Sequence, residues 1–349
     1  MTPQAVLTAL LDKRDLTRDE MLSLMRRIMG GELTPVQIAG ILVALRAKGE
    51  TVAEIAAAAE VMRELSTKVP VGAEANLVDT CGTGGDGAHT FNISTASALV
   101  AAAAGVKVAK HGGRSVSSTC GSADVLEALG VNVNLTPAQV AQSIHEIGVG
   151  FMFAPNHHSA MKYAAPVRRE LGVRTLFNLL GPLTNPAGAK NQVMGVFRKD
   201  LCRPLAEVLK SLGANHVMVV HGGDGMDEIT ITTETHVAEL KDGGISEYAI
   251  DPEEFGMKLG SIEKIKANNP EEAKARLVAV LDNTHGAARD IVAINAGAAI
   301  YVGGMAQTLE AGVKKAIQAI ASGEAKAKLE QLIAFSNRIG SRIHPLAVA

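Results

Sequence analysis

The chain has 349 residues, of which 47% are hydrophobic, 3% are aromatic and 20% are charged, and its formal net charge is -2. This composition is that of a globular protein and excludes a disordered chain. The near balance of charge and the few aromatic residues exclude a general attraction to nucleic acid or anionic lipid, so any anion site must be local.

The first 66 residues are predicted to be entirely helical. Three segments begin with a capping box, a threonine followed three positions later by Glu or Gln: Thr17–Glu20, Thr34–Gln37 and Thr51–Glu54. Apolar residues then recur with helical spacing, and no strand pattern interrupts them. We therefore expect a small all-helical N-terminal domain over residues 1–70, completed by residues 159–185 from later in the chain.

Strands alternate with helices from about residue 71 onward. Short apolar runs predict strands at 76–80, 106–109, 149–153, 192–197, 216–220 and 229–240, with helices between them and over most of 270–340. Such alternation is typical of a parallel sheet. The predicted fold class is therefore α/β: the small helical domain beside a larger α/β domain, residues 71–349, with a mainly parallel central sheet.

A glycine-rich loop, DTCGTGGDG at 79–87, ends the first predicted strand. Such a loop leading into a helix can hold phosphate on its backbone N–H groups. Its spacing Gly82-x-Gly84-x-x-Gly87 also matches the dinucleotide-binding fingerprint, which requires an acidic residue about 20 positions further on. Residues 87–123 contain neither Asp nor Glu, which argues against a dehydrogenase. A plain tight turn is the alternative.

A second loop, KHGGRSVSS at 110–118, follows the next predicted strand. It combines the charges of Lys110 and Arg114 with glycines and hydroxyl groups, which suit a phosphate ligand. The carboxyl ends of neighbouring parallel strands lie at one edge of a sheet, so we expect both loops to hold a single polyanion. Ser94, at the start of the helix between the loops, is interpreted either as its N-cap or as a ligand contact.

The adjacent acids Asp227 and Glu228 follow the strand predicted at 216–220. Carboxylates at a strand end suit Mg²⁺, which prefers oxygen ligands, although an ordinary acidic turn is the alternative. The neighbouring His157 and His158 cannot share a helix face, so they are interpreted as structural or substrate-lining.

Cys81, Cys120 and Cys202 match neither a disulfide framework nor zinc-ligand spacing, and a reducing cytoplasm is the simplest setting for them. The N-terminus lacks a signal-peptide pattern. The longest uncharged stretch, 87–106, contains polar residues that argue against a membrane span.

These strings occur together in one known family. The sequence resembles anthranilate phosphoribosyltransferase in GTGGD (82–86), NIST (92–95), KHG-x-RSVSS (110–118), PVRRELG (166–172), FNLLGPLTNP (177–186) and the pair Asp227–Glu228. The resemblance implies transfer of a phosphoribosyl group from 5-phosphoribosyl 1-diphosphate to the amine of anthranilate, the second step of tryptophan synthesis from chorismate. It also implies Mg²⁺ as cofactor, a cytoplasmic homodimer, and neither nucleic acid nor membrane as partner.

The resemblance further implies the site residues. Phosphoribosyl diphosphate would be held by Gly82, Gly85, Asp86, Thr90, Asn92, Ile93, Ser94, Thr95, Lys110, His111, Gly112, Gly113, Arg114, Ser115, Val116, Ser117, Ser118 and Ser122. Anthranilate would contact Gly82, Gly113 and Arg168, and Mg²⁺ would be served by Ser94, Asp227 and Glu228. The family commonly has Asn at the position of Gly113, and that Asn is associated with anthranilate. In this chain, the backbone or a water molecule could make the contact in place of the Asn side chain.

The implied chemistry requires no protein nucleophile. The amine attacks C1 of the ribose as diphosphate leaves, and catalysis comes from positioning the substrates and stabilising the departing charge. His111 is the candidate proton acceptor. Two rivals stay open: a pyrimidine nucleoside phosphorylase-like enzyme, which would bind inorganic phosphate, and a non-catalytic nucleic-acid-binding relative, whose basic surface the 34 basic and 36 acidic residues do not favour.

Overall fold

The computed structural model describes residues 1–72, 76–114 and 120–341. The N-terminal part consists of the helices α1 (Pro3–Leu11), α2 (Arg18–Met29), α3 (Pro35–Lys48) and α4 (Val52–Leu65). Thr17, Thr34 and Thr51 close the three predicted capping boxes and fix where α2, α3 and α4 begin. None of the described helices is both long and apolar enough to cross a membrane.

One seven-stranded sheet follows, in the order β3-β2-β1-β4-β5-β6-β7. Its strands are β1 (Val78–Thr80), β2 (Val108–Gly112), β3 (Val149–Phe153), β4 (Asn191–Gly195), β5 (His216–Gly222), β6 (Thr235–Lys241) and β7 (Gly244–Ile250). The first five strands are parallel, and β6 and β7 add an antiparallel edge. The predicted α/β class with a mainly parallel sheet is confirmed.

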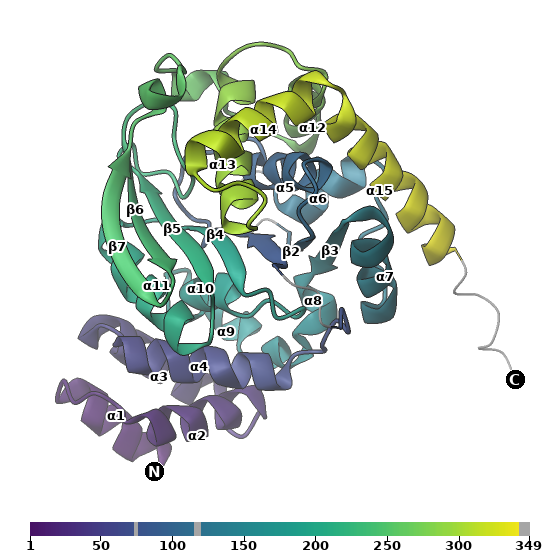
Figure 1. Ribbon diagram of the computed structural model, residues 1–349. Coiled ribbons are helices and arrows are strands. Elements are labelled where there is room, and N and C mark those ends of the chain that lie inside the picture. The colour runs from purple at the N-terminus through teal and green to yellow at the C-terminus, as the bar shows by residue number, and fades with distance from the viewer. Residues whose placement is uncertain (73–75, 115–119, 342–349) are drawn as a thin grey trace, which may run out of the picture.

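Helices cover both faces of this sheet (Figure 1). The helices that follow α4 in the chain are α5 (Ile93–Ala103), α6 (Ser122–Ala128), α7 (Pro137–Ile147), α8 (Ala154–His157), α9 (Ala165–Leu171), α10 (Phe177–Leu180), α11 (Cys202–Ser211), α12 (Pro270–Leu281), α13 (Ala287–Val302), α14 (Leu309–Ala321) and α15 (Glu324–Gly340). Successive residues of a strand face opposite sides. Accordingly, Met218 and Val220 of β5 pack into the core with α5 and α13, while Val217 and Val219 pack into the core with α11 and α4.

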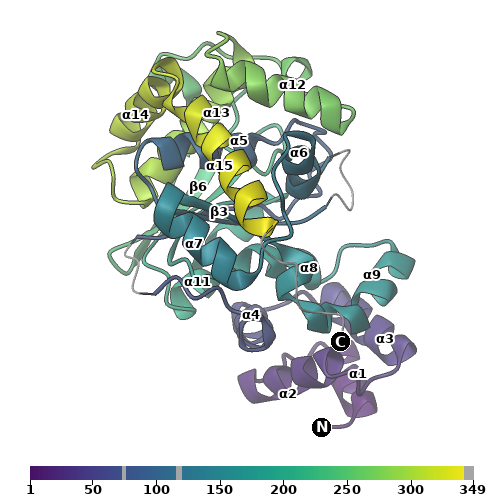
Figure 2. The same ribbon diagram turned by 90° about the vertical axis from the view of Figure 1, so that its right-hand side faces the viewer.

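The N-terminal helices share their apolar core with a later segment. Ala164, Val167, Phe177 and Leu180 belong to the same buried cluster as α2, α3 and α4, and α9 lies against α3 (Figure 2). Residues of the predicted completing segment 159–185 thus pack with the helical bundle. The boundary between residues 70 and 71 stays a prediction.

The predicted strand 229–240 is wrong in its first half, because β6 begins only at Thr235. Residues 229–234 instead form a loop whose backbone groups bond to side chains: Thr230 N donates to Thr235 Oγ1 at 3.0 Å and Thr232 N to Thr230 Oγ1 at 3.1 Å. The alternating threonines that resemble a strand pattern therefore fold this loop onto itself. The edge strand β7, largely exposed, lacks the apolar alternation that would have predicted it.

Candidate active site

The two predicted loops lie side by side at the carboxyl ends of β1 and β2, which pair in parallel. Lys110 Nζ, buried between them, donates to the carbonyl oxygen of Thr80 at 2.5 Å and to Ser94 Oγ at 3.1 Å. Asn92 Nδ2 donates to the Cys120 carbonyl oxygen at 3.1 Å and links the start of α5 to the end of the second loop. Ser115, Val116, Ser117 and Ser118 lie outside the described residues.

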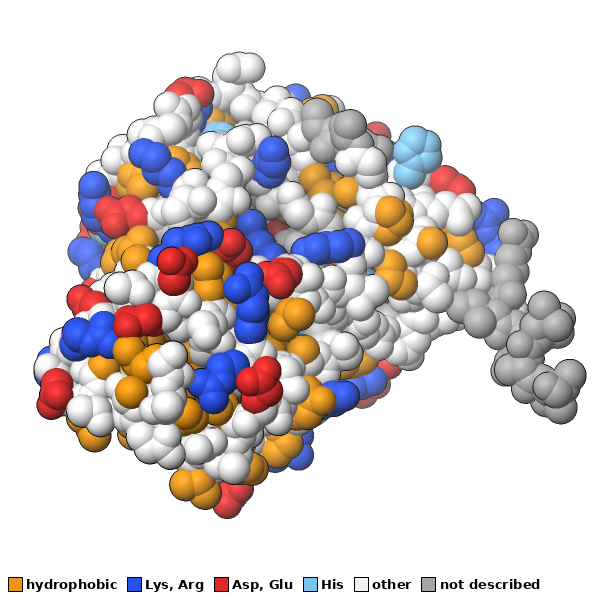
Figure 3. Space-filling view, turned by 90° about the horizontal axis from the view of Figure 1, so that it is seen from below, with side chains coloured by type: hydrophobic (Ala, Val, Ile, Leu, Met, Phe, Trp, Pro, Cys, Tyr) orange, Lys and Arg blue, Asp and Glu red, His pale blue; other side chains and the backbone are white. Residues whose placement is uncertain are grey.

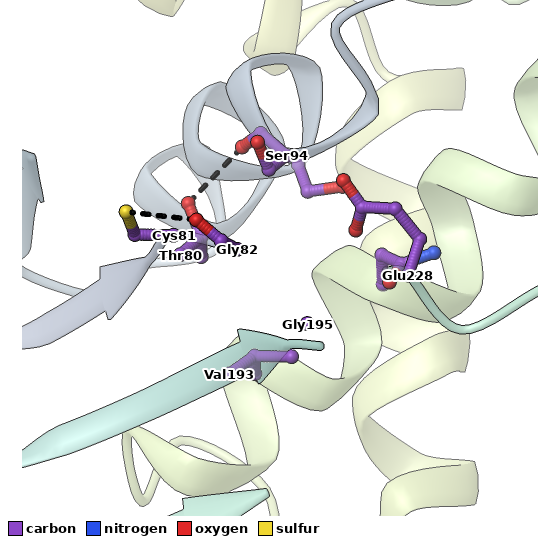
Figure 4. Close-up of a pocket in the computed structure, with 9 residues that line it drawn as sticks. Thr80, Cys81, Gly82, Ser94, Val193, Gly195 and Glu228 are labelled. Carbon is purple, nitrogen blue, oxygen red and sulfur yellow. Dashed lines mark hydrogen bonds between the residues drawn. The ribbon is translucent and has the colours of Figure 1, made fainter. Parts of the chain in front are cut away.

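A small pocket opens where the strand order reverses, between β1 and β4. It is lined by Thr80, Cys81, Gly82, Ser94, Ser97, Val193, Gly195, Glu228 and Asn295. Figure 4 shows Gly82 on the β1 side, Val193 and Gly195 on the β4 side, and Glu228 extending toward the start of α5. Open α/β sheets bind ligands at such switch points.

The acids Asp227 and Glu228 face the glycine-rich loop from the opposite side of this pocket. Asp227 Oδ2 accepts a hydrogen bond from Gly84 N at 2.7 Å, and Asp227 N donates to Asp86 Oδ2 at 3.3 Å. The carboxylate of Glu228 accepts from the backbone N–H of Ser94. Gly84 and Asp227, which are 143 positions apart in the sequence, are therefore in direct contact.

Burial and mutual repulsion raise the pKa values of these acids. Burial, together with the charges of Asp86 and Glu228, raises the pKa of Asp227 well above its ordinary value. Burial raises the pKa of Glu228 to about 8, where Asp86 adds to the shift and Lys110 opposes it. A bound cation would stabilise the charged carboxylates, so the acidic pair is suited to one.

The donor set fits Mg²⁺ that arrives with a phosphate ligand. Within the described ranges, no three His, Cys, Asp or Glu side chains are grouped so that they alone could hold a metal ion. Mg²⁺ commonly keeps several waters and is bound through one or two carboxylates together with substrate phosphates. Asp227 and Glu228 can supply the carboxylate ligands that the protein contributes to such a Mg²⁺ ion.

Asp79 is buried behind both loops and ties them together. It accepts from His111 N at 3.1 Å and from Asn185 Nδ2 at 2.7 Å. Asn185 also donates to the Ala109 carbonyl oxygen at 2.9 Å, which fixes β2 beside β1. Burial raises the pKa of Asp79 to about 6, opposed by Lys110. No role was predicted for Asp79 or Asn185 from the sequence. An acidic residue at the end of an apolar strand, such as Asp79, is nevertheless a sequence feature that can indicate a functional role.

Three buried imidazoles, of His111, His157 and His158, lie behind the second loop. The rings of His111 and His158 are 5.1 Å apart, and all three Nε2 atoms lack a hydrogen-bond partner among the described residues. Burial lowers the pKa of His111 to about 3 and that of His158 to about 4. Both rings are therefore neutral at pH 7, and His111 keeps a free nitrogen that can take up or share a proton.

Arg168 of α9 is turned inward, unlike its exposed neighbour Arg169. Its guanidinium lies 5.3 Å from the centre of the Phe177 ring, and burial lowers its pKa. In the part of the chain that the structure describes, no carboxylate pairs with it. A half-buried cation of this kind is suited to an anionic ligand.

The start of α5 rules out one of the two interpretations of Ser94, that of an N-cap. Its N-cap residue is Asn92, so Ser94 is not the N-cap but lies in the first turn. The side chain of Ile93 is in the core, and its N–H donates to the Phe91 carbonyl oxygen at 2.7 Å. Thr95 is buried, and its Oγ1 has no partner in the described chain. Thr90 forms a bridge with Lys266.

The remaining predicted residues lie around these elements. Gly85 has a φ of +76°, which favours glycine, and Asp86 Oδ1 accepts from Ala88 N at 3.1 Å. Gly112 and Gly113 pack against Ser122, whose Oγ is 3.4 Å from the Gly113 carbonyl oxygen. Arg114 is directed toward α6, where it pairs with Asp124 at 2.9 Å and Glu127 at 2.6 Å.

Arg174, in the loop between α9 and α10, was not predicted as a site residue. Its guanidinium donates to the Gly85 carbonyl oxygen and lies 4.2 Å from the centre of the Phe197 ring. It thereby connects the segment that carries Arg168 to the glycine-rich loop. The contact joins residues 89 positions apart, so the residues next to Arg174 in the sequence give no signal of it.

Known proteins match this chain over almost its whole length. Residues 74–326 match the model described as glycosyl transferase family, a/b domain, and residues 4–66 match that family's helical bundle domain. An anthranilate phosphoribosyltransferase of Thiobacillus denitrificans is 64% identical over 338 residues, covering 97% of this chain and 98% of the relative. Another, of Laribacter hongkongensis, is 61% identical over 341 residues, covering 98% of this chain and 100% of the relative.

Two solved structures share the fold over almost the whole chain. Anthranilate phosphoribosyltransferase from Thermus thermophilus has a TM-score of 0.89 at 46% identity, covering 95% of this chain and 99% of that one. The enzyme from Saccharomyces cerevisiae, solved in complex with phosphoribosyl diphosphate and Mg, has a TM-score of 0.87 at 25% identity, covering 96% and 98%.

Proposed function

Because this chain belongs to the anthranilate phosphoribosyltransferase family, we propose that it transfers the phosphoribosyl group of 5-phosphoribosyl 1-diphosphate to the amine of anthranilate. The products are N-(5-phosphoribosyl)anthranilate and diphosphate. The observation that carries the proposal is the contact between the acidic pair and the glycine-rich loop, through Asp227 and Gly84 at 2.7 Å. Neither a nucleoside phosphorylase nor a nucleic-acid-binding relative requires that pair.

Phosphoribosyl diphosphate would lie between the two loops. Gly82, Gly85 and Asp86 offer backbone N–H groups at the end of β1, and Lys110 supplies a buried positive charge at the end of β2. Mg²⁺, when bound, would neutralise charge on the diphosphate, with Asp227 and Glu228 as its protein ligands and Ser94 beside them. Lys110 and the loop N–H groups would stabilise the departing diphosphate.

Anthranilate would bind with its carboxylate at Arg168, the half-buried cation without a carboxylate partner in the described chain. The amine nitrogen forms a bond to C1 of the ribose while the bond from C1 to the diphosphate oxygen breaks. The amine then loses a proton, for which the neutral His111 ring is the candidate acceptor. Alignment of two bound substrates can supply about 7–11 kcal/mol of barrier lowering.

The experiment removes the acids one at a time, with Asp227→Asn and Glu228→Gln. Anthranilate fluorescence follows turnover at limiting Mg²⁺, and Glu234→Gln, an exposed acid of the same loop, is the matched control. We expect the half-saturating Mg²⁺ concentration to rise in the two site variants and to stay unchanged in the control. Wild-type Mg²⁺ dependence in both site variants would refute their role.

We further propose a homodimer formed through the N-terminal helices. Leu11 of α1 and Val36 and Val43 of α3 are 71%, 81% and 45% exposed, and Figure 3 shows apolar side chains between charged ones on the lower face of the molecule. Exposed apolar residues of this kind suit contact with a second copy. Val36→Glu should yield monomers in analytical ultracentrifugation.

We also propose a cytoplasmic location, because the free thiols of Cys81 and Cys202 suit a reducing cytoplasm.

A further inference from the structure

One polar side chain interrupts the apolar middle of α13. Residues 291–300 of this helix are all buried, and Asn295 is the one polar member of that run. Burying an amide costs free energy unless its donors and acceptor are paired. An apolar residue would suit the surrounding core better, so the amide requires an explanation.

The amide of Asn295 is paired almost entirely with one residue. Asn295 Oδ1 accepts from Ile229 N at 2.9 Å, and Nδ2 donates to the Ile229 carbonyl oxygen at 2.8 Å. The second hydrogen of Nδ2 goes to the Ile291 carbonyl oxygen, one helical turn earlier, at 2.8 Å. Ile229 directly follows the acidic pair, and Asn295 also lines the pocket that contains Glu228.

We propose that Asn295 is a positioning residue that fixes the backbone after Glu228 so that the acidic pair faces the cation and diphosphate site. This inference rests on the proposed function. A peptide unit is planar, so a bond to Ile229 N orients the unit that joins it to Glu228, and a bond to its carbonyl oxygen orients the next unit. Asn295 thereby restrains both units that flank Ile229.

The acidic loop needs such an anchor because it has no ladder partner. Residues 229–234 lie outside the strands. The carbonyl oxygens of Ile231 and Glu234 accept from other backbone N–H groups. The N–H groups of Ile229, Thr230 and Thr232 instead donate to side chains. Asp224 organises the loop internally by accepting from Met226 N at 3.1 Å and from Thr230 Oγ1 at 2.6 Å. Only Asn295 connects Ile229 to a rigid helix among these contacts.

The expected effect is selective. Residues that orient metal ligands typically contribute about 10–100-fold in metal affinity or activity. Loss of the Asn295 amide should therefore raise the half-saturating Mg²⁺ concentration and the KM for phosphoribosyl diphosphate by about tenfold or more. Arg168 lies on α9, which packs against α3, so the KM for anthranilate should stay nearly unchanged. A merely structural asparagine would lower stability without this division.

The test compares Asn295→Leu, which nearly keeps the side-chain volume, with Ser336→Ala. Ser336 is a matched control because it is fully buried on another C-terminal helix, α15, and also accepts from a loop backbone, Asn132 N at 3.1 Å. Thermal melting, Mg²⁺ dependence and both KM values are measured for each. Binding of Mn²⁺ in the presence of phosphoribosyl diphosphate, followed by electron paramagnetic resonance without anthranilate, gives a readout independent of turnover.

We expect both variants to melt at lower temperature, and only Asn295→Leu to weaken Mn²⁺ binding and Mg²⁺ activation. If Asn295→Leu does not fold, Asn295→Gln, which displaces the amide by one methylene, carries the same expectation. Wild-type Mn²⁺ and Mg²⁺ constants in a folded Asn295 variant would overturn the inference, as would equal losses in Ser336→Ala. A wild-type protein without Mg²⁺-dependent transfer would instead count against the proposed function.

Discussion

The close packing of β4 against the acidic loop yields a prediction whose size follows from the structure. A Cβ added to Gly195 would be placed 1.5 Å from the backbone oxygen of Asp227, whereas such approaches essentially never fall below 3.0 Å. Gly195→Ala must therefore displace the Asp227 backbone by about 1.5 Å, because a packed interior cannot absorb the overlap. A misplacement of about 1 Å can cost about 100-fold in rate. We expect kcat/KM for phosphoribosyl diphosphate to fall by about 100-fold, or about 2.7 kcal/mol of transition-state stabilisation.

Two further glycine variants grade this effect. A Cβ on Gly82 would meet the carboxylate of Asp227, which can rotate without a shift of the backbone. Because this carboxylate is a proposed Mg²⁺ ligand, Gly82→Ala should act through Mg²⁺ affinity, at a cost of roughly tenfold. In Gly244→Ala the nearest atom to the new Cβ is the Lys241 carbonyl oxygen at 3.6 Å, an ordinary contact, so this strand variant is the control. The assay is anthranilate fluorescence, with circular dichroism to verify folding. Full activity of Gly195→Ala, or an equal loss in Gly244→Ala, would contradict the reasoning.

Arg168→Ala removes the unpaired cation and should raise the KM for anthranilate by about 10- to 150-fold, as loss of a charged hydrogen bond does, with the KM for phosphoribosyl diphosphate unchanged; exposed Arg169→Ala is the control. Burial lowers the pKa of His158 from 6.5 to about 4. As pH falls, the unfolded chain therefore takes up a proton before the folded one does, and this group lowers the free energy of unfolding by about 3 kcal/mol between these two pH values. Urea titrations at several pH values should show a shallower loss of stability in His158→Gln. An unaltered dependence of the unfolding free energy on pH would disprove this role of His158. Gly113→Asn should fold as stably as the wild type, because a Cβ there meets, among the described residues, only the Cβ of Ala154 at 3.9 Å. The KM of this variant for anthranilate should fall, since the family commonly carries Asn at this position. A raised KM would contradict that expectation.

Local chemistry and the meeting of the two loops were predictable from the sequence, and the individual long-range side-chain contacts were not. Capping threonines such as Thr34 and the glycine-rich loop depend on residues within a few positions, so their patterns can be read directly. The pairing of Ile229 with Asn295 joins residues 66 positions apart, and no periodicity encodes it. The mistaken strand at 229–234 has the same origin, because Thr230 serves Asp224 at 2.6 Å and not a neighbouring strand. Only tertiary packing decides whether such threonines lie in a strand or bond to side chains within a loop.

The surplus of acid in the site bears on which phosphate compounds it can accept. Asp86, Asp227 and Glu228 lie together, and the buried charge of Lys110 opposes the rise in the pKa of Glu228. A free diphosphate or inorganic phosphate would add negative charge to a pocket in which burial already raises the pKa of Glu228 to about 8. A diphosphate that carries a divalent cation reverses this balance, because the cation faces the acids while the phosphate oxygens face the loop N–H groups. The acidic pair would thus select the metal complex of the substrate over the free anion, and so separate this site from one built for phosphorolysis.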